Sequence, residues 1–231
     1  MDFLKSIFLL LVATIPGFIY IAILRGGTPR YISDKLILFG LVAGIMAGLM
    51  ILVSKFFFLQ DLLQAPGGEV LTVTLFVSFI EAGLLEELVK NLSYLGLINL
   101  LGQNQKLSPF DLFALGGLVG LGFGVFENGY YALTPEYAKL TILLDRLYSA
   151  IPAHMIMNFT FGYLRARKVS IWLALLVSIL IHAIYDFFAL PSTLLGTILT
   201  KLVLVIGLGF VLWMGKQLWE ESQSATSSPK L

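Results

Sequence analysis

The sequence predicts an all-α fold, a polytopic bundle of transmembrane helices that encloses a polar cavity within the membrane. Of its 231 residues, 58% are hydrophobic and only 13% are charged, and the mean hydropathy is +0.92. Apolar runs of about 18 residues or more, long enough to cross a bilayer, recur along the whole chain. Ionisable residues interrupt several of these runs, and they predict the polar cavity.

Seven spans fit the hydropathy pattern, with six or eight as the alternatives. The third is longer than a hydrocarbon core of about 30 Å needs, so it is expected to tilt or to project from the membrane. The fifth is close to the lower length limit, and turn-forming residues separate the spans. In order, the predicted spans are Phe3–Leu24, Leu36–Phe58, Val70–Leu101, Phe110–Leu133, Leu147–Leu164, Ile171–Leu190 and Leu194–Gly215.

The chain is predicted to form one integral membrane domain, residues 1–219, followed by a polar tail, residues 220–231. The first apolar stretch is similar to a secretory signal peptide, but it is longer than 20 residues, contains Pro16 and lacks a small-residue cleavage site. It is therefore predicted to be a transmembrane helix. The tail is rich in serine and is predicted to be disordered.

Composition excludes several classes of function. The chain has no cysteine, so it forms no disulfide, no thiolate nucleophile and no cysteine-based metal site. Its formal net charge is +1 and it has no basic cluster, so no nucleic-acid partner is expected. The chemistry therefore has to come from Glu, Asp, His, Ser or Tyr, in the surroundings of the lipid bilayer.

The distribution of Lys and Arg predicts the orientation in the membrane. With the N-terminus outside, eight basic residues flank the inner ends of the spans and five flank the outer ends. This bias favours an outer N-terminus and an inner C-terminus. The inner residues are Arg25, Arg30, Lys35, Lys106, Arg165, Arg167, Lys168 and Lys216, and the outer residues are Lys5, Lys55, Lys139, Arg146 and Lys201.

Two spans carry glycines at every fourth position, in the pattern of a doubled GxxxG. Such glycines lie on one helix face, where a neighbouring backbone can approach closely. We therefore interpret both patterns as helix-packing surfaces. They are Gly40, Gly44 and Gly48 in the second span and Gly116, Gly120 and Gly124 in the fourth.

Eight ionisable residues lie within or next to the predicted spans. A charged side chain at the bilayer centre costs about 2.5–3.5 kcal/mol on insertion scales. These residues are therefore expected to face one another or water, and both histidines of the chain are among them. The set is Glu81, Glu86, Glu87, Lys90, Glu127, His154, His182 and Asp186.

Helical spacing groups the ionisable residues of the third span. At about 100° per residue, Glu86 and Lys90 are one turn apart and can pair, and Glu87 lies over Asn91. Glu81 is about 140° around the helix from Glu86, so we leave it out of the predicted site. We expect Lys90 to hold one carboxylate ionised while the other stays free to take a proton.

Two later spans each place a polar residue four positions after a histidine. In HAIYD, the Asp186 carboxylate can accept from one ring nitrogen of His182, fix its tautomer and leave the other nitrogen facing the site. His154 and Asn158 repeat this spacing in AHMIMN. Asn128, next to Glu127, lies on the same face as the second glycine pattern.

Four motifs appear in order along the chain: EELVK, FGVFEN, HMIMNFTFGY and HAIYD, at residues 86–90, 123–128, 154–163 and 182–186. This set resembles the PrsW family of intramembrane proteases. The pattern of that family is EExxK, FxxxEN, a histidine followed eight residues later by glycine, and HxxxD, on successive helices. The resemblance extends from the second span to the sixth.

The PrsW family is related to the type II CAAX prenyl endopeptidases, which carry EExxxR, FxxxH and HxxxN or HxxxD. This sequence has Glu127 where those enzymes have histidine, and Lys90 in place of an arginine one residue later. It therefore resembles the PrsW side of the group, and no prenylated substrate is expected.

The resemblance implies an endopeptidase that cuts a single-pass membrane protein near or within its transmembrane segment. PrsW-type members are associated with removal of the outer part of an anti-sigma factor, a form of regulated proteolysis. The implied setting is a prokaryotic cytoplasmic membrane, with the single-pass substrate and the bilayer as partners. The sequence does not determine the oligomeric state.

The implied reaction gives each candidate a role. Peptide hydrolysis needs an activated water, a proton donor for the leaving amine and a group that stabilises the oxyanion. Glu86 is assigned to the water, with Glu87 as the alternative, and Glu87 or Glu127 would assist proton transfer. His182, oriented by Asp186, would polarise the water or the oxyanion. The other candidates are His154 among the catalytic residues and Lys90, Asn128 and Asn158 among the supporting ones.

Three other interpretations stay open. No metal or cofactor is expected, and the nearest alternative is a zinc-dependent protease on the same scaffold, although the chain has no HExxH motif. The second is a proton-coupled transporter or channel, for which intramembrane Glu, His and Asp are also typical; no inverted repeat links the two halves. The third is a non-catalytic scaffold in which the polar residues join the helices.

Overall fold

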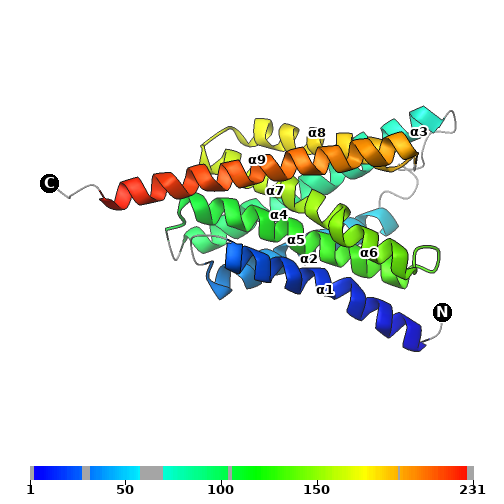
Figure 1. Cartoon of the computed structure of the whole chain (residues 1–231). Coiled ribbons are helices and arrows are strands. Elements are labelled where there is room, and N and C mark those ends of the chain that lie inside the picture. Colours follow the sequence, from blue (N-terminus) through cyan, green and yellow to red (C-terminus); the bar gives the residue numbers. More distant parts are fainter. Residues whose placement is uncertain (1–2, 28–31, 58–69, 104–105, 192, 228–231) are drawn as a thin grey trace.

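The described part of the chain folds into helices without any strand. The computed structural model describes residues 3–27, 32–57, 70–103, 106–191 and 193–227. Figure 1 shows the long helices side by side, with the C-terminal end of α9 projecting beyond the others. In chain order the elements are α1 (Phe3–Gly27), α2 (Asp34–Phe57), α3 (Val70–Phe76), the π-helix η1 (Val77–Glu86), α4 (Glu87–Gly102), α5 (Pro109–Leu133), α6 (Leu140–Tyr148), α7 (Ala150–Ala166), α8 (Ile171–Ala189) and α9 (Leu194–Ser227).

Five of the described helices are long and apolar enough to cross a membrane, namely α1, α2, α5, α8 and α9. The prediction of an all-α membrane bundle is confirmed. The two other predicted spans also form helices, but they differ from this group. Residues 70–102 are divided among α3, η1 and α4 and contain four charged residues. Helix α7, with 17 residues, is shorter than the about 20 residues that usually span a bilayer.

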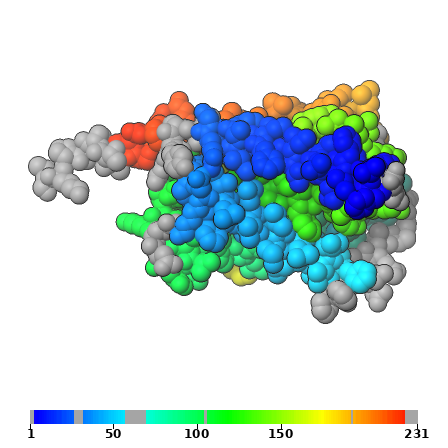
Figure 2. Space-filling view, turned by 90° about the horizontal axis from the view of Figure 1, so that it is seen from below, coloured from blue at the N-terminus to red at the C-terminus, as the bar shows by residue number. Residues whose placement is uncertain are grey.

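Helix α5 lies at the centre of the bundle, packed mainly against α1, α2 and α7. Its start is fixed by a capping box. The Ser108 hydroxyl accepts from the Asp111 backbone N–H at 3.1 Å, and the Asp111 carboxylate accepts from the Ser108 N–H at 2.8 Å. Figure 2 shows α1 and α2 on one face of the molecule, where both cover α5.

The predicted glycine surfaces are helix contacts, as expected. A Cβ atom at Gly44 would meet the backbone of α5. On the opposite side of α5, a Cβ atom at Gly116 would meet the Asn158 carbonyl oxygen of α7, and one at Gly120 would meet the His154 carbonyl oxygen. This close approach of α5 and α7 brings the end of α5 beside the histidine of α7.

Gly120 provides a test of this packing. We expect Gly120→Ala to lower the free energy of unfolding by about 1–3 kcal/mol, because the added methyl group forces α5 away from the backbone of α7. Thermal unfolding of the purified protein in detergent measures the effect. Gly96→Ala on α4 is the matched control, since a Cβ atom there meets nothing within 4 Å. Equal unfolding temperatures for the two variants would contradict the close contact.

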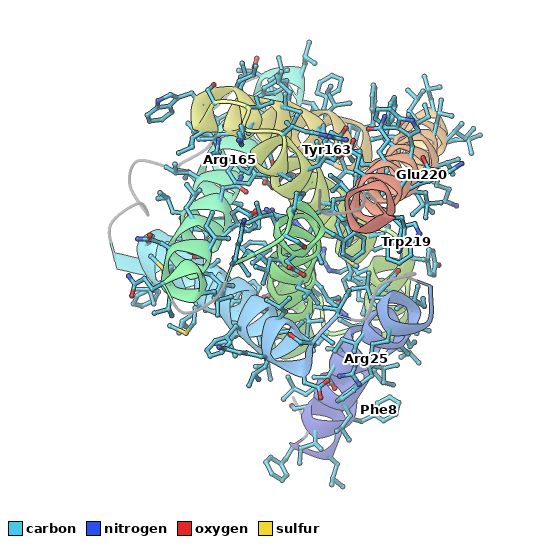
Figure 3. All side chains as sticks on the ribbon, turned by 90° about the vertical axis from the view of Figure 1, so that its left-hand side faces the viewer. Phe8, Arg25, Tyr163, Arg165, Trp219 and Glu220 are labelled. Atoms are coloured by element: carbon cyan, nitrogen blue, oxygen red, sulfur yellow. The ribbon has the colours of Figure 1, made fainter. Side chains whose placement is uncertain are left out.

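Helix α9 continues into the segment that was predicted to be a disordered tail, and it ends at Ser227. Arg167, just after α7, donates to both carboxylate oxygens of Glu221, at 2.8 and 2.7 Å. The Tyr163 hydroxyl donates to Gln217 at 2.6 Å. These contacts hold α9 beside α7, as seen along the bundle in Figure 3. The chain is therefore helical beyond residue 220, while residues 228–231 lie outside the described part.

Candidate active site

A polar cavity of about 640 Å³ lies between η1, α5, α8 and the junction of α6 with α7. The predicted site residues that line it are Glu86, Glu127, His154, His182 and Asp186. The others are buried beside it, namely Glu87, Lys90, Asn128 and Asn158. A second hollow of about 580 Å³, between α1, α5, α7 and α9, is lined by no carboxylate or imidazole. Of these two hollows, only the first offers acid–base groups.

Glu87 belongs to a buried network rather than to the cavity. Its Oε1 accepts from His182 Nδ1 at 2.8 Å and pairs with the Lys90 ammonium group. Its Oε2 accepts from Ser178 Oγ at 2.6 Å and from Asn91 Nδ2 at 3.5 Å. The predicted contact between Glu87 and Asn91 is therefore confirmed. With both oxygens occupied, Glu87 holds the groups around it in position.

Glu86 reaches the cavity from the end of the π-helix. Its Oε2 lies 4.0 Å from His182 Nε2, and its Oε1 lies 3.8 Å from the Lys55 Nζ. The predicted pairing of Glu86 with Lys90 is wrong. Lys90 is fully buried and pairs with Glu87, because both side chains lie on the enclosed side of α4. Glu86 is thus left on the side that faces the cavity.

Glu81 lines the same cavity, although the spacing argument had excluded it. The Lys55 Nζ lies 2.9 Å from Glu81 Oε1, so one ammonium group stands near both Glu81 and Glu86. A π-helix closes hydrogen bonds between residues five apart, and Glu81 and Glu86 are five residues apart within Val77–Glu86. The α-helical angle therefore does not apply to this segment, and the prediction that Glu81 points away from the cavity is wrong.

His154 has a hydrogen-bond partner at each ring nitrogen. Nε2 lies 2.9 Å from Glu127 Oε2, and Nδ1 lies 3.1 Å from the Lys90 Nζ. An ammonium group only donates, so Nδ1 accepts and the ring proton is assigned to Nε2, which donates to Glu127. The predicted pairing of His154 with Asn158 is not found. Asn158 faces α4 instead and donates to Asn91 Oδ1 at 3.0 Å.

Asn128, predicted as a supporting residue, does not line the cavity but contacts Arg146 of its wall. Its Oδ1 accepts from Arg146 Nε at 3.2 Å, and its Nδ2 lies 3.5 Å from the Ala13 carbonyl oxygen of α1. It is completely buried, because the side chain points from α5 toward α1 and α6. Asn128 therefore connects three helices behind the wall of the cavity.

His182 stands between two carboxylates. The predicted contact with Asp186 is present, with Nε2 to Oδ2 at 3.4 Å. The other ring nitrogen does not face the site as predicted, because Nδ1 lies 2.8 Å from the buried Glu87 carboxylate. The ring meets that of His154 edge-on, with centroids 5.3 Å apart. The two imidazoles of the chain are thus neighbours in one cavity, and Glu86 shares it with them, as predicted.

Sequence reasoning missed three residues at or beside the site. Lys55 and Arg146 both line the cavity, but their positions near span ends made them look like loop charges. Both belong to largely apolar helical segments, and a charged residue within apolar sequence is the same pattern that identified the glutamates. Ser178 contacts Glu87 from within an apolar run, and only its position four residues before His182 pointed to it.

The cavity contains a donor set that fits a metal ion. Glu86, His154 and His182 each offer one ligand atom, and within the described residues these atoms lie within 4.8 Å of one another. Two histidines and a glutamate are an established ligand set for catalytic zinc. Glu87, which accepts from the far nitrogen of His182, is the kind of outer carboxylate that orients such ligands.

Comparison with known proteins identifies the family of the chain. The model of the family described as PrsW family intramembrane metalloprotease matches residues 33–214. The chain is 29% identical over 124 residues to the protein named Protease PrsW from Clostridioides difficile (strain 630). This match spans 49% of the chain and about half, 51%, of the length of that relative. No solved structure matches the chain significantly. The predicted resemblance to the PrsW family is confirmed, and the chain belongs to this family, which its description classes as intramembrane metalloproteases.

Proposed function

We propose that this protein is an intramembrane endopeptidase of the glutamic type, which hydrolyses a single-pass membrane protein. The observation that carries the proposal is the convergence of Glu86, His154 and His182 on one polar cavity, with their donor atoms within 4.8 Å. A cavity of about 640 Å³ is large enough for water and a segment of a substrate chain. Membership of a protease family supports the peptide bond as the target.

Glu86 is proposed to take a proton from the attacking water. It lines the cavity, whereas the oxygens of Glu87 are used in the buried network. This difference supports Glu86 over Glu87 as the base. The water oxygen then bonds to the carbonyl carbon of the scissile peptide, and the carbonyl oxygen becomes an oxyanion.

His182 is proposed to polarise the water or to stabilise the oxyanion. Its contacts with Glu87 and Asp186 fix the plane of the ring. The intermediate collapses when the carbon–nitrogen bond breaks, and the leaving amine takes up the proton that Glu86 received from water. Glu127, the other glutamate beside an imidazole in the cavity, is proposed to assist this proton transfer.

The description of the family as metalloproteases raises the question of a metal ion. Glu86, His154 and His182 would hold it, and a bound ion would supply Lewis-acid polarisation of water or of the carbonyl group. Both ring nitrogens of His154 are engaged, by Glu127 and by Lys90, so this ring has to give up a contact before it binds an ion. The proposal assigns activation of water to Glu86, with such an ion as the alternative.

We therefore expect cleavage by the purified protein to continue after treatment with a chelator. The metal content of the protein is measured by elemental analysis before and after treatment, and the cleavage rate is measured on the same samples. A rate that falls on chelation and returns with Zn²⁺ would contradict the glutamic mechanism. In that case, loss of zinc from a His182→Ala protein would identify the proposed donor set as the ligands.

The proposed substrate is a membrane-anchored protein such as an anti-sigma factor, cut in the course of regulated proteolysis. The positive-inside pattern supports an outer N-terminus and an inner C-terminus in a prokaryotic cytoplasmic membrane. In that orientation, the ends of the helices that carry the cavity, including the start of α7 and the end of α8, lie toward the outer side.

Co-expression with a panel of tagged single-pass membrane proteins tests the function. We expect the wild-type protein to convert at least one of them to a shorter membrane-anchored fragment. A His182→Ala protein of equal abundance is expected to leave the panel intact. A panel cut equally by both would contradict an active site at this cavity.

A further inference from the structure

Arg146 is a charged residue of the cavity wall that belongs to none of the four motifs. Its NH2 group lies 2.5 Å from Glu127 Oε2, and its Nε donates to Asn128 at 3.2 Å. The guanidinium group also stacks on the Tyr131 ring, 3.9 Å from the centroid. Its side chain is only 13% exposed. Three separate contacts with α5 therefore fix the direction of this arginine.

The contact with Glu127 connects Arg146 to the chemistry. Glu127 Oε2 is shared by two donors, Arg146 and His154 Nε2, the latter at 2.9 Å. The Glu127 side chain lies at the cavity wall and is 23% exposed. Loss of the arginine would remove one of these two donors and free the carboxylate to turn toward the cavity.

We propose that Arg146 is a positioning residue for the proposed peptide hydrolysis, on which this inference rests. It holds the Glu127 carboxylate against His154, so that His154 keeps its proton on Nε2 and its ring stays beside that of His182. Lys90 donates a hydrogen bond to the other nitrogen of the same ring, Nδ1. Arg146 thus acts through Glu127 and has no contact of its own with the substrate in this role.

Arg146 belongs to helix α6, and contacts that do not involve Arg146 hold this helix against α1. Leu143 is 1% exposed and packs in a cluster with Leu9 and Ala13 of α1. The Tyr20 hydroxyl of α1 donates to the Leu147 carbonyl oxygen at 2.8 Å. Because these contacts do not involve Arg146, a substitution of the arginine is expected to leave α6 docked. Positioning and folding can therefore be separated by experiment.

The test compares Arg146→Gln and Arg146→Lys with Arg167→Gln. Arg167 makes the matched arginine–glutamate pair, with Glu221, at the far end of α7. The chain has only two histidines, so ¹⁵N-histidine spectra of the purified protein in detergent report both rings directly. Steady-state cleavage of a reporter and thermal unfolding are measured on the same proteins.

We expect Arg146→Gln to shift the ring nitrogens of His154 and to leave those of His182 close to their wild-type positions. Its kcat should fall about 10- to 100-fold, as for other groups that orient active-site residues, while KM stays within about twofold. Arg146→Lys keeps the charge and should recover part of kcat. Arg167→Gln should change neither the spectra nor the rate.

Unchanged His154 resonances in Arg146→Gln would overturn the proposal. It would equally be overturned if the loss of rate followed the unfolding temperature across all three variants, since that is the pattern of a purely structural pair. The spectra do not depend on catalysis. Absence of cleavage by the wild-type protein would therefore contradict the proposed function and still leave the effect of Arg146 on His154 measurable.

Discussion

Replacing Glu86 with glutamine is expected to lower the rate of substrate cleavage by about 10²- to 10⁴-fold, the range for loss of a general base. The amide has nearly the shape of the carboxylate, and its oxygen can still face the Lys55 ammonium group, which lies 3.8 Å from Glu86 Oε1. It cannot take the proton of water. The purified variant, assayed with a cleavable single-pass reporter, should therefore lose kcat while it keeps the wild-type unfolding temperature.

Glu220→Gln is the control for this substitution. Glu220 pairs with Lys216 on the exposed part of α9, far from the cavity along the chain, and its side chain is 63% exposed. The control is expected to cleave at the wild-type rate. Cleavage by Glu86→Gln at the same rate as this control would show that Glu86 is not the base.

Replacing Lys90 with methionine is expected to cause the largest loss of stability. Lys90 and Glu87 are both completely enclosed, and removal of the ammonium group leaves a buried carboxylate with no cation on it. Breaking such a pair costs about 3–5 kcal/mol. The unfolding temperature of the purified protein in detergent should fall by roughly 10 °C. His154 also loses its partner at Nδ1, so cleavage should fall as well.

Two further variants make this result specific. Lys216→Met breaks the exposed pair with Glu220 and should leave the unfolding temperature unchanged, since exposed pairs contribute little. Adding Glu87→Leu to Lys90→Met removes the stranded carboxylate and should recover part of the stability, but not the activity, because His182 then lacks its Nδ1 partner. A single Lys90→Met protein as stable as wild type would contradict the role of the buried pair.

The membrane fold could be predicted because each of its signals is local. Long apolar runs, glycines four residues apart and the turn residues between them appear in short windows, and the structure has helices at all the predicted spans. The free-energy cost of a charge in lipid also made it possible to predict the site residues. Glu86, Glu127, His154, His182 and Asp186 stood out because they interrupt apolar sequence, and all of them line one cavity.

The errors come from contacts that have no local signal. The π-helix Val77–Glu86 follows α3 without any break in the apolar pattern, so α-helical angles put Glu81 on the wrong face. Which glutamate would pair with Lys90 depended on which face of α4 is enclosed by α7 and α8. Arg146 contacts residues 18 and 19 positions away. Such partners are determined by how the helices pack against one another, and the local pattern of a single sequence does not predict this packing.

The most direct test of the central claim compares membrane fragments from cells of the source organism that express either the wild-type protein or Glu86→Gln at equal abundance. Quantitative proteomics of the membrane fraction identifies the new chain ends of single-pass proteins. An active site at this cavity predicts fragments cut near or within a transmembrane segment that form only with the wild-type protein. Identical fragment profiles in the two strains would contradict it.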